Sequence, residues 1–392
     1  MAGEGLRVLL VSGEYPPMEG GVADFTRILG EALCAQGAEV DVLTSREAGA
    51  GPEGSPVHCH AEMEGWGWRA LSGALGRLVR HVQPDVVNVQ YQTAAYAMHP
   101  AVNALPRLAR GVPVVTTFHD LLVPYLFPKA GPLRWWANLA LARASRAIIV
   151  TNVQDRDRLA THAWARRGGL HLVPIGSNVP CRVPADFDPA AWRRLLGLAP
   201  GALMLCYFGF LNASKGGEEL VRALGRLVAA GHDAHLLMIG GAVGASDPTN
   251  AAYLAAVRAL IKEEGLGKRV VWTGHVAPEQ VSASFAASDI CILPYRDGAS
   301  YRRGSLMAAL AHGMPIVTTE PQAPQPWLEH GENVWLVPPA DAEALAAGCR
   351  RVAEDAALRE RLARGARELH THFSWPEIAA RTLEVYRDVA AP

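Results

Sequence analysis

The residues of this 392-residue chain that are best suited to chemistry are cations at the starts of two expected helices. Arg302 and Arg303 come directly before a helix expected over 304–312, and Lys215 comes before another, followed by a Gly-Gly pair. A helix N-terminus carries partial positive charge and unpaired N–H groups, so cations there lower stability unless an anion is bound. Because glycine in both turns lets the backbone approach a ligand, the pattern favours one shared anion, such as a diphosphate. A solvated lysine or arginine is the alternative for each turn taken alone.

Two features of the first half of the chain also suit ligand contact. Gly20 and Gly21, in "GEYPPMEGGVADF", follow the first expected strand and could turn backbone N–H groups toward a ligand, although a tight turn has the same pattern. His119 and Asp120 follow another strand in "VVTTFHDLL". Histidine can bind sugar hydroxyls or move a proton, and a structural histidine is the alternative.

Motifs for metal, nucleophilic or dinucleotide chemistry do not appear in the sequence. Asp155–Asp157 and Asp186–Asp188 match a DxD pattern that can hold Mg²⁺, but the first pair starts an expected helix and the second lies in a linker, so we interpret both as structural. The six cysteines lack CxxC spacing, and HExxH, GxSxG, Walker A and GxGxxG patterns are absent. We therefore expect no metal site and no resident cofactor.

Composition narrows the class of protein. The net charge of −1 argues against a nucleic-acid-binding protein, and scattered cysteines suit a reducing cytoplasm. No apolar run reaches transmembrane length or signal-peptide form, so we expect a soluble cytoplasmic protein. The stretch "GPLRWWANLALARASRA" is amphipathic, and we interpret it as a packed helix, with peripheral membrane contact as the alternative.

Short apolar runs alternate with helical patterns along the chain, which is typical of parallel α/β domains. The expected strands lie at 6–12, 38–44, 84–90, 112–119, 146–152 and 170–176, then at 203–209, 234–240, 269–274, 289–295, 314–319 and 333–338. A proline-rich linker near 178–190 separates the two series. Ligands of such sheets bind beyond the carboxyl ends of strands, so we expect the ligand in a cleft between two domains.

Taken in order, six segments resemble a GT-B fold glycosyltransferase of family 4, over nearly the whole chain. They are "PPMEGGVADFTRILGEALCAQGAEVDVLT", "YFGFLNASKGGEELVRAL", "VVWTGHVAPEQVSASFAASDICILPY", "LMAALAHGMPIVTT", "ENVWLVPPAD" and "FSWPEIAARTLEVY". The resemblance implies two Rossmann-like domains: an acceptor-binding domain over 1–180 and a nucleotide-sugar-binding domain over 181–372. It also implies that a helix over 373–392 packs back on the first domain.

The resemblance implies hexosyl transfer from a nucleotide sugar, UDP- or GDP-linked, to an acceptor, with retention of configuration and without a metal. Lys215, Arg303 and His119 are the expected catalytic residues. The expected donor-binding residues are Gly20, Gly21, Gly209, Lys215, Gly274, His275, Val276, Arg302, Arg303, Gly304 and Ser305. Domain closure on the donor is expected as well.

The chain departs from the family pattern at several positions. The places of two family glutamates hold Ser300 and Ala308, and the place of a family arginine holds Phe210. A family acid falls at about Pro326. The chain is therefore expected to be a divergent branch, in which Arg302 and Arg303 replace the missing cation. Possible sugar or ribose contacts are Asp120, Asp297 and Glu320.

Two alternatives stay open at this point. A nucleotide-sugar epimerase would keep the fold and change the chemistry, and a degenerate binding protein would have lost the chemistry with the two glutamates. The sequence does not name the base, the sugar or the acceptor, which could be a small molecule, a glycan or a lipid-linked glycan.

Overall fold

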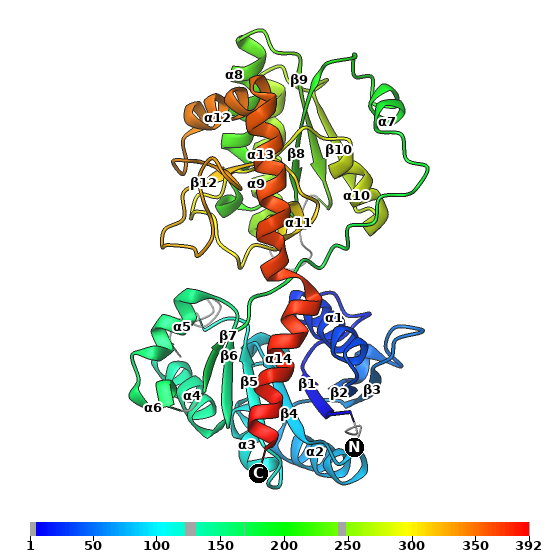
Figure 1. Cartoon of the computed structure of the whole chain (residues 1–392), viewed down its shortest axis with the longest axis vertical. Helices are drawn as coiled ribbons and strands as arrows, with labels where there is room; N and C mark the ends of the chain where they lie inside the picture. The colour runs from blue at the N-terminus through cyan, green and yellow to red at the C-terminus, as the bar shows by residue number, and fades with distance from the viewer. Residues whose placement is uncertain (1–4, 122–130, 168, 242–247, 392) are drawn as a thin grey trace. The chain divides into compact units, whose positions relative to one another are not determined.

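The computed structural model describes residues 5–121, 131–167, 169–241 and 248–391, and its chain divides into two compact units. Unit 1 contains the chain up to Gly176 together with the segment from Trp375, and unit 2 runs from Ser177 to Ser374. The sequence predicts domain boundaries after residues 180 and 372, whereas the two units divide after Gly176 and after Ser374. Each unit has its own sheet and helices (Figure 1).

Unit 1 is built on a seven-stranded parallel sheet with strand order β3-β2-β1-β4-β5-β6-β7. The strands are β1 (Arg7–Ser12), β2 (Glu39–Ser45), β3 (His58–Met63), β4 (Val86–Tyr91), β5 (Val114–Phe118), β6 (Ala147–Val150) and β7 (Leu170–Leu172). Alternate residues of β1 enter different cores, Leu9 and Val11 one of them and Val8 and Leu10 the other. The sheet is therefore covered on both faces, as the near-continuous apolar runs predict.

One strand of unit 1 was missed by the sequence analysis. The edge strand β3 pairs with β2, with Asp41 opposite His58. Its sequence "HCHAEM" is mostly half-buried or exposed and lacks an apolar run. Because an edge strand needs only one neighbour, polar pairs such as His60 Nε2 to Asp41 Oδ1, at 2.6 Å, replace apolar packing there.

The helices of unit 1 are α1 (Gly21–Ala35), α2 (Trp68–Val82), α3 (Leu105–Leu108), α4 (Gly131–Ala144), α5 (Val153–Ala160), α6 (Ala163–Arg167) and α14 (Trp375–Ala390). The C-terminal helix α14 lies beside α1 (Figure 1), and Ile378, Leu383 and Tyr386 enter the same core as Leu29 and Leu33 of α1. The expected return of the C-terminal helix to the first domain is therefore confirmed.

The segment that the sequence analysis considered for membrane contact forms α4. Leu139 and Leu141 of this helix are buried, and the Trp135 ring lies 4.0 Å from the Arg158 guanidinium. Leu133 and Trp136 are 75% and 67% exposed. The helix is thus packed on one side, and contact of its exposed side with a membrane stays a prediction. None of the described helices is long and apolar enough to cross a membrane.

Unit 2 contains a six-stranded parallel sheet with strand order β10-β9-β8-β11-β12-β13. The strands are β8 (Leu203–Phe208), β9 (Ala234–Ile239), β10 (Val270–Gly274), β11 (Ile290–Leu293), β12 (Ile316–Thr319) and β13 (Trp335–Val337). The helices are α7 (Pro189–Leu195), α8 (Gly217–Ala229), α9 (Pro248–Glu263), α10 (Pro278–Ala286), α11 (Gly304–Ala311), α12 (Ala342–Glu354) and α13 (Ala356–His370). All six strands expected in this half are present.

The strand order of unit 2 fixes where a ligand site belongs. The chain leaves β8 toward β9 on one side and later places β11 on the other side of β8, so the order of strands reverses between β8 and β11. In open parallel sheets ligands bind at such a switch point, outside the carboxyl ends of the strands. The turns after β8 and β11 are the two that carry the predicted cations.

Each DxD pair contains one aspartate that takes part in a helix N-terminus. Asp155 lies in the first turn of α5, where its backbone N–H donates to Asn152 Oδ1 at 2.8 Å. Asp188 caps α7 by accepting from the Ala190 N–H at 2.8 Å, which starts a helix at the end of the expected linker.

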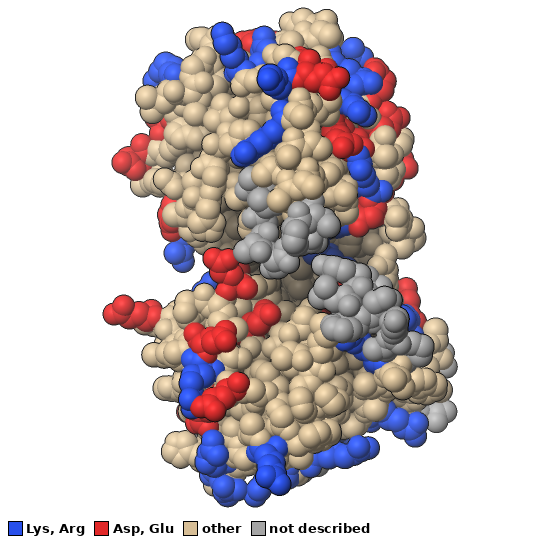
Figure 2. All heavy atoms as spheres, turned by 180° about the vertical axis from the view of Figure 1, so that it is seen from behind, with Lys and Arg blue, Asp and Glu red and all other residues tan. Residues whose placement is uncertain are grey.

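On the face shown in Figure 2, acidic and basic side chains occur on both units, so neither unit is uniformly basic there.

Candidate active site

The first half of the candidate site is the turn after β8. Lys215 ends a short 3₁₀ turn, and Gly216 follows with φ of 69° before α8 begins at Gly217. A Cβ atom on Gly216 would lie 1.9 Å from the carbonyl oxygen of Pro294, the residue after β11. Glycine is therefore required at position 216 for two reasons: the backbone is left-handed, and the neighbouring turn approaches closely.

The second half is the segment between β11 and α11. Arg303 is the N-cap residue of α11, with no side-chain capping bond, as expected from the sequence. Its guanidinium group forms an ion pair with the Asp297 carboxylate. Gly298, with φ of 79°, turns this segment so closely that a Cβ would lie 2.6 Å from the Glu320 carbonyl oxygen. The segment is thus packed between the ends of β8 and β12.

The two turns bring their cations together. Lys215 Nζ lies 3.4 Å from Ser305 Oγ in the first turn of α11. The buried Tyr295 ring lies beside both cations, 5.4 Å from Lys215 Nζ and 5.0 Å from the Arg303 guanidinium carbon. The Tyr295 hydroxyl lies 2.7 Å from the same Ser305 Oγ. The convergence predicted from the two helix starts is present inside unit 2.

The electrostatics of this cluster favour an anion. Burial, and then the nearby Arg303 cation, lower the pKa of Lys215 to about 8, against the opposing effect of Asp297. Two cations and a helix N-terminus around one point raise the energy of the unliganded cluster, and a bound anion would lower it. A group with several negatively charged oxygens is the ligand that this arrangement can bind most favourably.

Arg296 and Tyr295 were not identified from the sequence. The Arg296 side chain donates to Glu219 Oε1 at 2.8 Å and to Glu218 Oε2 at 2.7 Å, both in the first turn of α8. Its backbone N–H donates to the Ser214 carbonyl at 2.9 Å. These contacts hold the two turns together, and the pairing of "PYRD" with "GGEE" becomes visible only once β8 and β11 are known to be neighbours.

The other donor-binding residues predicted for unit 2 lie on several different segments, some against α11 and some two strands away. Gly209, with φ of 116°, lies against α11, since a Cβ there would meet Ser305 Cβ at 3.7 Å. Gly274 (φ 70°) ends β10, two strands from β8, and His275 and Val276 follow it. These three residues form no hydrogen bond to Lys215 or Ser305 within the described chain. Glu320 is exposed after β12, with its N–H bonded to the Val337 carbonyl. Arg302 is half-buried, and Gly304 is exposed at the first position of α11.

Phe210 occupies the position where the family resemblance places an arginine. Its side chain is 50% exposed. Its ring lies so close to Gly241 that a Cβ atom added to Gly241 would be 2.8 Å from the ring. The Tyr207 hydroxyl donates to the Phe210 carbonyl at 3.1 Å. An aromatic ring therefore stands beside the turn where a cation was expected, and Arg303 is the cation that approaches Lys215.

The residues predicted in unit 1 lie at carboxyl ends of its strands. Gly20 caps α1, and a Cβ on it would lie 2.3 Å from Glu14 Oε2, so the Glu14 carboxylate rests against the glycine loop. Burial raises the pKa of the Glu14 carboxyl group. Glu14 was not among the site residues predicted from the sequence. Gly21 is exposed at the first position of α1.

The surroundings of His119 favour the neutral imidazole. Burial lowers its pKa to about 4, and its Nε2 lies 2.9 Å from Gln90 Oε1. Because the Gln90 amide nitrogen donates to Asn88, the Gln90 oxygen accepts from His119 Nε2–H, and Nδ1 keeps a lone pair. Phe25 packs edge-on against the ring at 4.7 Å. Asp120 is half-buried beside it in sequence.

Two family models match the chain in the regions just described. Residues 20–176 match a glycosyl transferase 4-like domain, and residues 202–355 match the glycosyl transferases of group 1. The chain belongs to glycosyltransferase family 4. The fold class, the two-sheet GT-B architecture and the family predicted from the sequence are confirmed together.

Known proteins similar to this glycosyltransferase are of several kinds. A D-inositol 3-phosphate glycosyltransferase from Nocardioides is 28% identical, over 98% of this chain and 90% of its own. A glycogen synthase from Mycobacterium tuberculosis is 27% identical, over 97% of this chain and 94% of its own. A sucrose-phosphate synthase structure from Thermosynechococcus elongatus has 25% identity and a TM-score of 0.72, covering 98% of both chains.

A further solved structure shares the fold. Anabaena HepE in complex with UDP and glucose has a TM-score of 0.73 at 19% identity, covering 98% of this chain and 100% of its own. The similar proteins are transferases and synthases, so they do not favour the epimerase or the inactive binding protein left open by the sequence.

Proposed function

We propose that this glycosyltransferase uses a nucleotide-sugar donor and binds the donor diphosphate at the cluster of Lys215, Arg303 and Ser305. The observation that carries the proposal is the convergence of two cations from different turns on the N-terminus of α11, with Lys215 Nζ 3.4 Å from Ser305 Oγ. We expect the backbone N–H groups of Gly304 and Ser305 to face the ligand with these cations.

Cleavage of the bond between the sugar and the diphosphate builds negative charge on the departing phosphate oxygens. Lys215 and Arg303 are fixed by a shared ring and by Asp297, so they need little reorganisation when that charge develops. Removing one such donor typically costs roughly 10²–10³-fold in rate. Because two side-chain cations supply the charge that a metal supplies elsewhere, we propose metal-independent transfer.

The finer assignments are also proposals. We assign the nucleoside to the backbone of Gly274, His275 and Val276, and a sugar or ribose contact to Glu320. Asp297, the other candidate for such a contact, is paired with Arg303, so we assign it to holding that cation. In unit 1 we assign hydroxyl contacts to Gly20, Gly21, His119 and Asp120. Since His119 is neutral above about pH 4, it suits hydrogen bonding to a hydroxyl rather than clamping an anion. Retention of configuration rests on the family resemblance.

The similar proteins suggest which donor and acceptor to test first. HepE structures contain UDP or UDP-glucose, which supports UDP-linked hexoses as first donors, with GDP-linked ones next. The curated relatives include enzymes named for D-inositol 3-phosphate and for glycogen. A phosphorylated polyol and an α-glucan are therefore the first acceptors to offer.

A thermal-shift screen of the purified protein against UDP, GDP, ADP, dTDP and their common sugars tests the proposal. A ligand at ~100 times its Kd should add roughly 2.7 kcal/mol to the free energy of unfolding. We expect one nucleotide series to raise Tm equally with EDTA and with Mg²⁺. The shift should disappear in Lys215→Ala and Arg303→Ala and persist in Lys268→Ala, which removes an exposed lysine of the same unit.

The screen has three results that would overturn parts of the proposal. No shift with any nucleotide would remove the nucleotide-sugar assignment. A shift that persists in both Lys215→Ala and Arg303→Ala would move the diphosphate away from this cluster. A shift that requires Mg²⁺ would overturn metal independence alone.

A further inference from the structure

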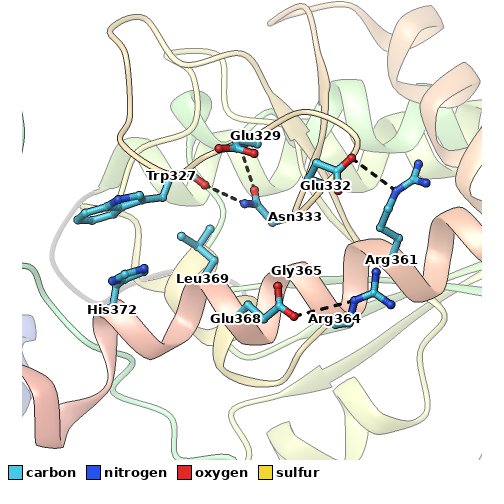
Figure 3. Close-up of a pocket in the computed structure, with 10 residues that line it drawn as sticks. All are labelled: Trp327, Glu329, Glu332, Asn333, Arg361, Arg364, Gly365, Glu368, Leu369 and His372. Carbon is cyan, nitrogen blue, oxygen red and sulfur yellow. Dashed lines mark hydrogen bonds and ion pairs between the residues drawn. The ribbon is translucent and has the colours of Figure 1, made fainter.

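A pocket of unit 2 lies between the loop over 326–333 and the last turns of α13 (Figure 3). Its volume is about 290 Å³. The lining combines an indole ring, an amide, carboxylates and guanidinium groups, from Trp327, Asn333, Glu329, Glu368, Arg361 and Arg364. Neither Lys215 nor Arg303 takes part in it.

The loop holds Trp327 in a fixed and unusual conformation. Trp327 has φ of 66°, a value that a bulky side chain rarely adopts, yet it is 44% exposed. Its carbonyl accepts from Asn333 Nδ2 at 2.8 Å, and the preceding Pro326 carbonyl accepts from the Tyr301 hydroxyl. Asn333 Oδ1 also accepts from the Glu329 N–H at 2.9 Å. The surroundings therefore determine the position of the indole.

Two aromatic neighbours support the indole, and the Phe373 ring packs edge-on against it at 6.3 Å. The indole ring stacks on the His372 imidazole at 4.5 Å with an interplanar angle of 8°, so one face is covered (Figure 3). Gly365 lets the loop settle on α13, because a Cβ there would lie 2.2 Å from the Glu332 carbonyl oxygen. A supported aromatic ring next to a preformed hollow provides an apolar contact surface at low entropic cost.

The polar groups around the ring retain hydrogen-bonding capacity. The ion pairs of Arg361 with Glu332 and of Arg364 with Glu368 are long, at 3.9 Å each, and all four side chains are at least 45% exposed. The Glu329 side chain forms no hydrogen bond or ion pair with another described residue. Carboxylates accept and guanidinium groups donate, so together they can serve neighbouring hydroxyl groups.

The charges decide which ligand fits. Three glutamates and two arginines give a net negative lining, which disfavours a phosphate, while the two guanidinium groups disfavour an organic cation. A wholly apolar ligand would leave the charged groups without partners. A neutral sugar ring has an apolar C–H face for the indole and a rim of hydroxyls for the charged groups. The volume lies just below the ~300–1,000 Å³ range of pockets for drug-sized ligands, which suits one ring.

We propose that this pocket is a non-catalytic carbohydrate-binding site of unit 2, which takes one neutral pyranose unit of a glycan against Trp327. In a glycosyltransferase such a site would raise the local concentration of an acceptor or product glycan. The inference uses no residue of the diphosphate cluster, so it stands or fails independently of the proposed donor site.

Saturation-transfer difference NMR on the intact protein tests this inference directly. The probes are the methyl glycosides of glucose, galactose, mannose and N-acetylglucosamine, each without nucleotide. We expect transfer from the protein to at least one pyranose ring, with millimolar Kd. Trp327→Gly removes the indole while accepting the left-handed backbone, and it should weaken binding at least tenfold. Glu329→Gln preserves the shape of the side chain and should weaken binding severalfold.

Two controls make the result specific. Trp68→Ala removes another exposed indole, 52% exposed on α2, and should leave binding unchanged. Lys215→Ala should abolish nucleotide binding and leave the sugar signal intact. No transfer to any of the four glycosides would overturn the proposal, as would a signal that survives both Trp327→Gly and Glu329→Gln. If Trp327→Gly fails to fold, Glu329→Gln alone decides the outcome.

Discussion

Lys215 and Arg303, which follow different strands of unit 2, lie beside the same buried ring, at 5.4 and 5.0 Å from the centre of Tyr295. Burial, together with the nearby Arg303 cation, disfavours the charged form of Lys215 in the unliganded cluster and lowers its pKa. An anion between the two cations would raise that pKa again. Binding and proton uptake are therefore linked at this site, which makes the ligand class testable by pH alone.

The first prediction is that nucleotide-sugar affinity falls as pH rises through about 8. The free protein loses the Lys215 proton near that pH, whereas the bound anion requires the ammonium form. Above about pH 8, Kd should rise by up to roughly tenfold per pH unit, and below about pH 7 it should be constant. Isothermal titration with the nucleotide sugar that gives the largest thermal shift measures this profile.

Lys215→Arg is the matched control for this profile. A guanidinium group stays charged throughout the range, so the variant should bind with an affinity that changes little between about pH 7 and 9. An equally steep rise of Kd in Lys215→Arg would show that another group titrates, and Lys215 would lose its assignment.

The second prediction concerns Asp297, whose carboxylate pairs with Arg303. Asp297 competes with an incoming phosphate for the guanidinium group, so Asp297→Asn should tighten binding of a nucleoside diphosphate. The pair is half-exposed on the Asp297 side, and such pairs contribute about 0.2–1 kcal/mol, so we expect a gain of up to about fivefold. Asp233→Asn, which disrupts the exposed pair with Arg269, is the control and should change nothing. Weaker binding in Asp297→Asn would instead indicate a direct contact of Asp297 with the ligand.

The main features of both sheets could be predicted because buried parallel strands have near-continuous apolar sequences. The edge strand β3 escaped this reasoning, since only β2 pairs with it and its side chains are largely polar. Lys215 and Arg303 could be predicted because cations at helix starts conflict with the helix dipole wherever they occur. That conflict is local, so the sequence alone reveals it.

The residues that join the two turns could not be predicted in the same way. Arg296, Tyr295 and Glu14 have ordinary local sequence contexts, and their importance comes from partners distant in the chain. Trp327 gives no sign in the sequence of its left-handed backbone, which depends on hydrogen bonds from Tyr301 and Asn333. Non-local contacts of this kind require the fold to be known first.

The third prediction separates the two roles of Tyr295. Tyr295→Phe keeps the ring beside the cations and removes the hydroxyl that bonds Ser305, so it should lower the free energy of unfolding by about 1 kcal/mol with little loss of nucleotide affinity. Tyr295→Leu also removes the cation–π contacts and should weaken nucleotide binding by roughly tenfold. Urea unfolding and isothermal titration provide the two measurements. Equal affinities of the two variants would show that the ring does not position the cations.

The fourth prediction is that His119 makes unit 1 sensitive to acid. Its pKa is about 4 in the folded protein and ordinarily 6.5, so between these values the unfolded state binds more protons and stability falls as pH falls. The loss should reach up to roughly 3 kcal/mol near pH 4. Tm measured from about pH 7 to pH 4 should therefore fall less steeply in His119→Gln than in the wild type. His58→Gln replaces an exposed histidine and should keep the wild-type slope of Tm against pH. If His119→Gln also kept the wild-type slope, His119 would not be the source of the acid sensitivity.

The fifth prediction tests whether the contact between the two turns builds the site. Gly216 and Gly231 both have left-handed backbones, with φ of 69° and 90°, but a Cβ on Gly231 would meet nothing within 4 Å, whereas on Gly216 it would lie 1.9 Å from the Pro294 carbonyl. Gly231→Ala should therefore cost about 1 kcal/mol from backbone strain alone. Gly216→Ala should cost about 1–3 kcal/mol more and should also weaken nucleotide binding, since Lys215 must move away from Ser305. Unfolding and titration of both variants check this. If Gly216→Ala loses stability and keeps its affinity, the spacing of the two turns does not determine diphosphate binding.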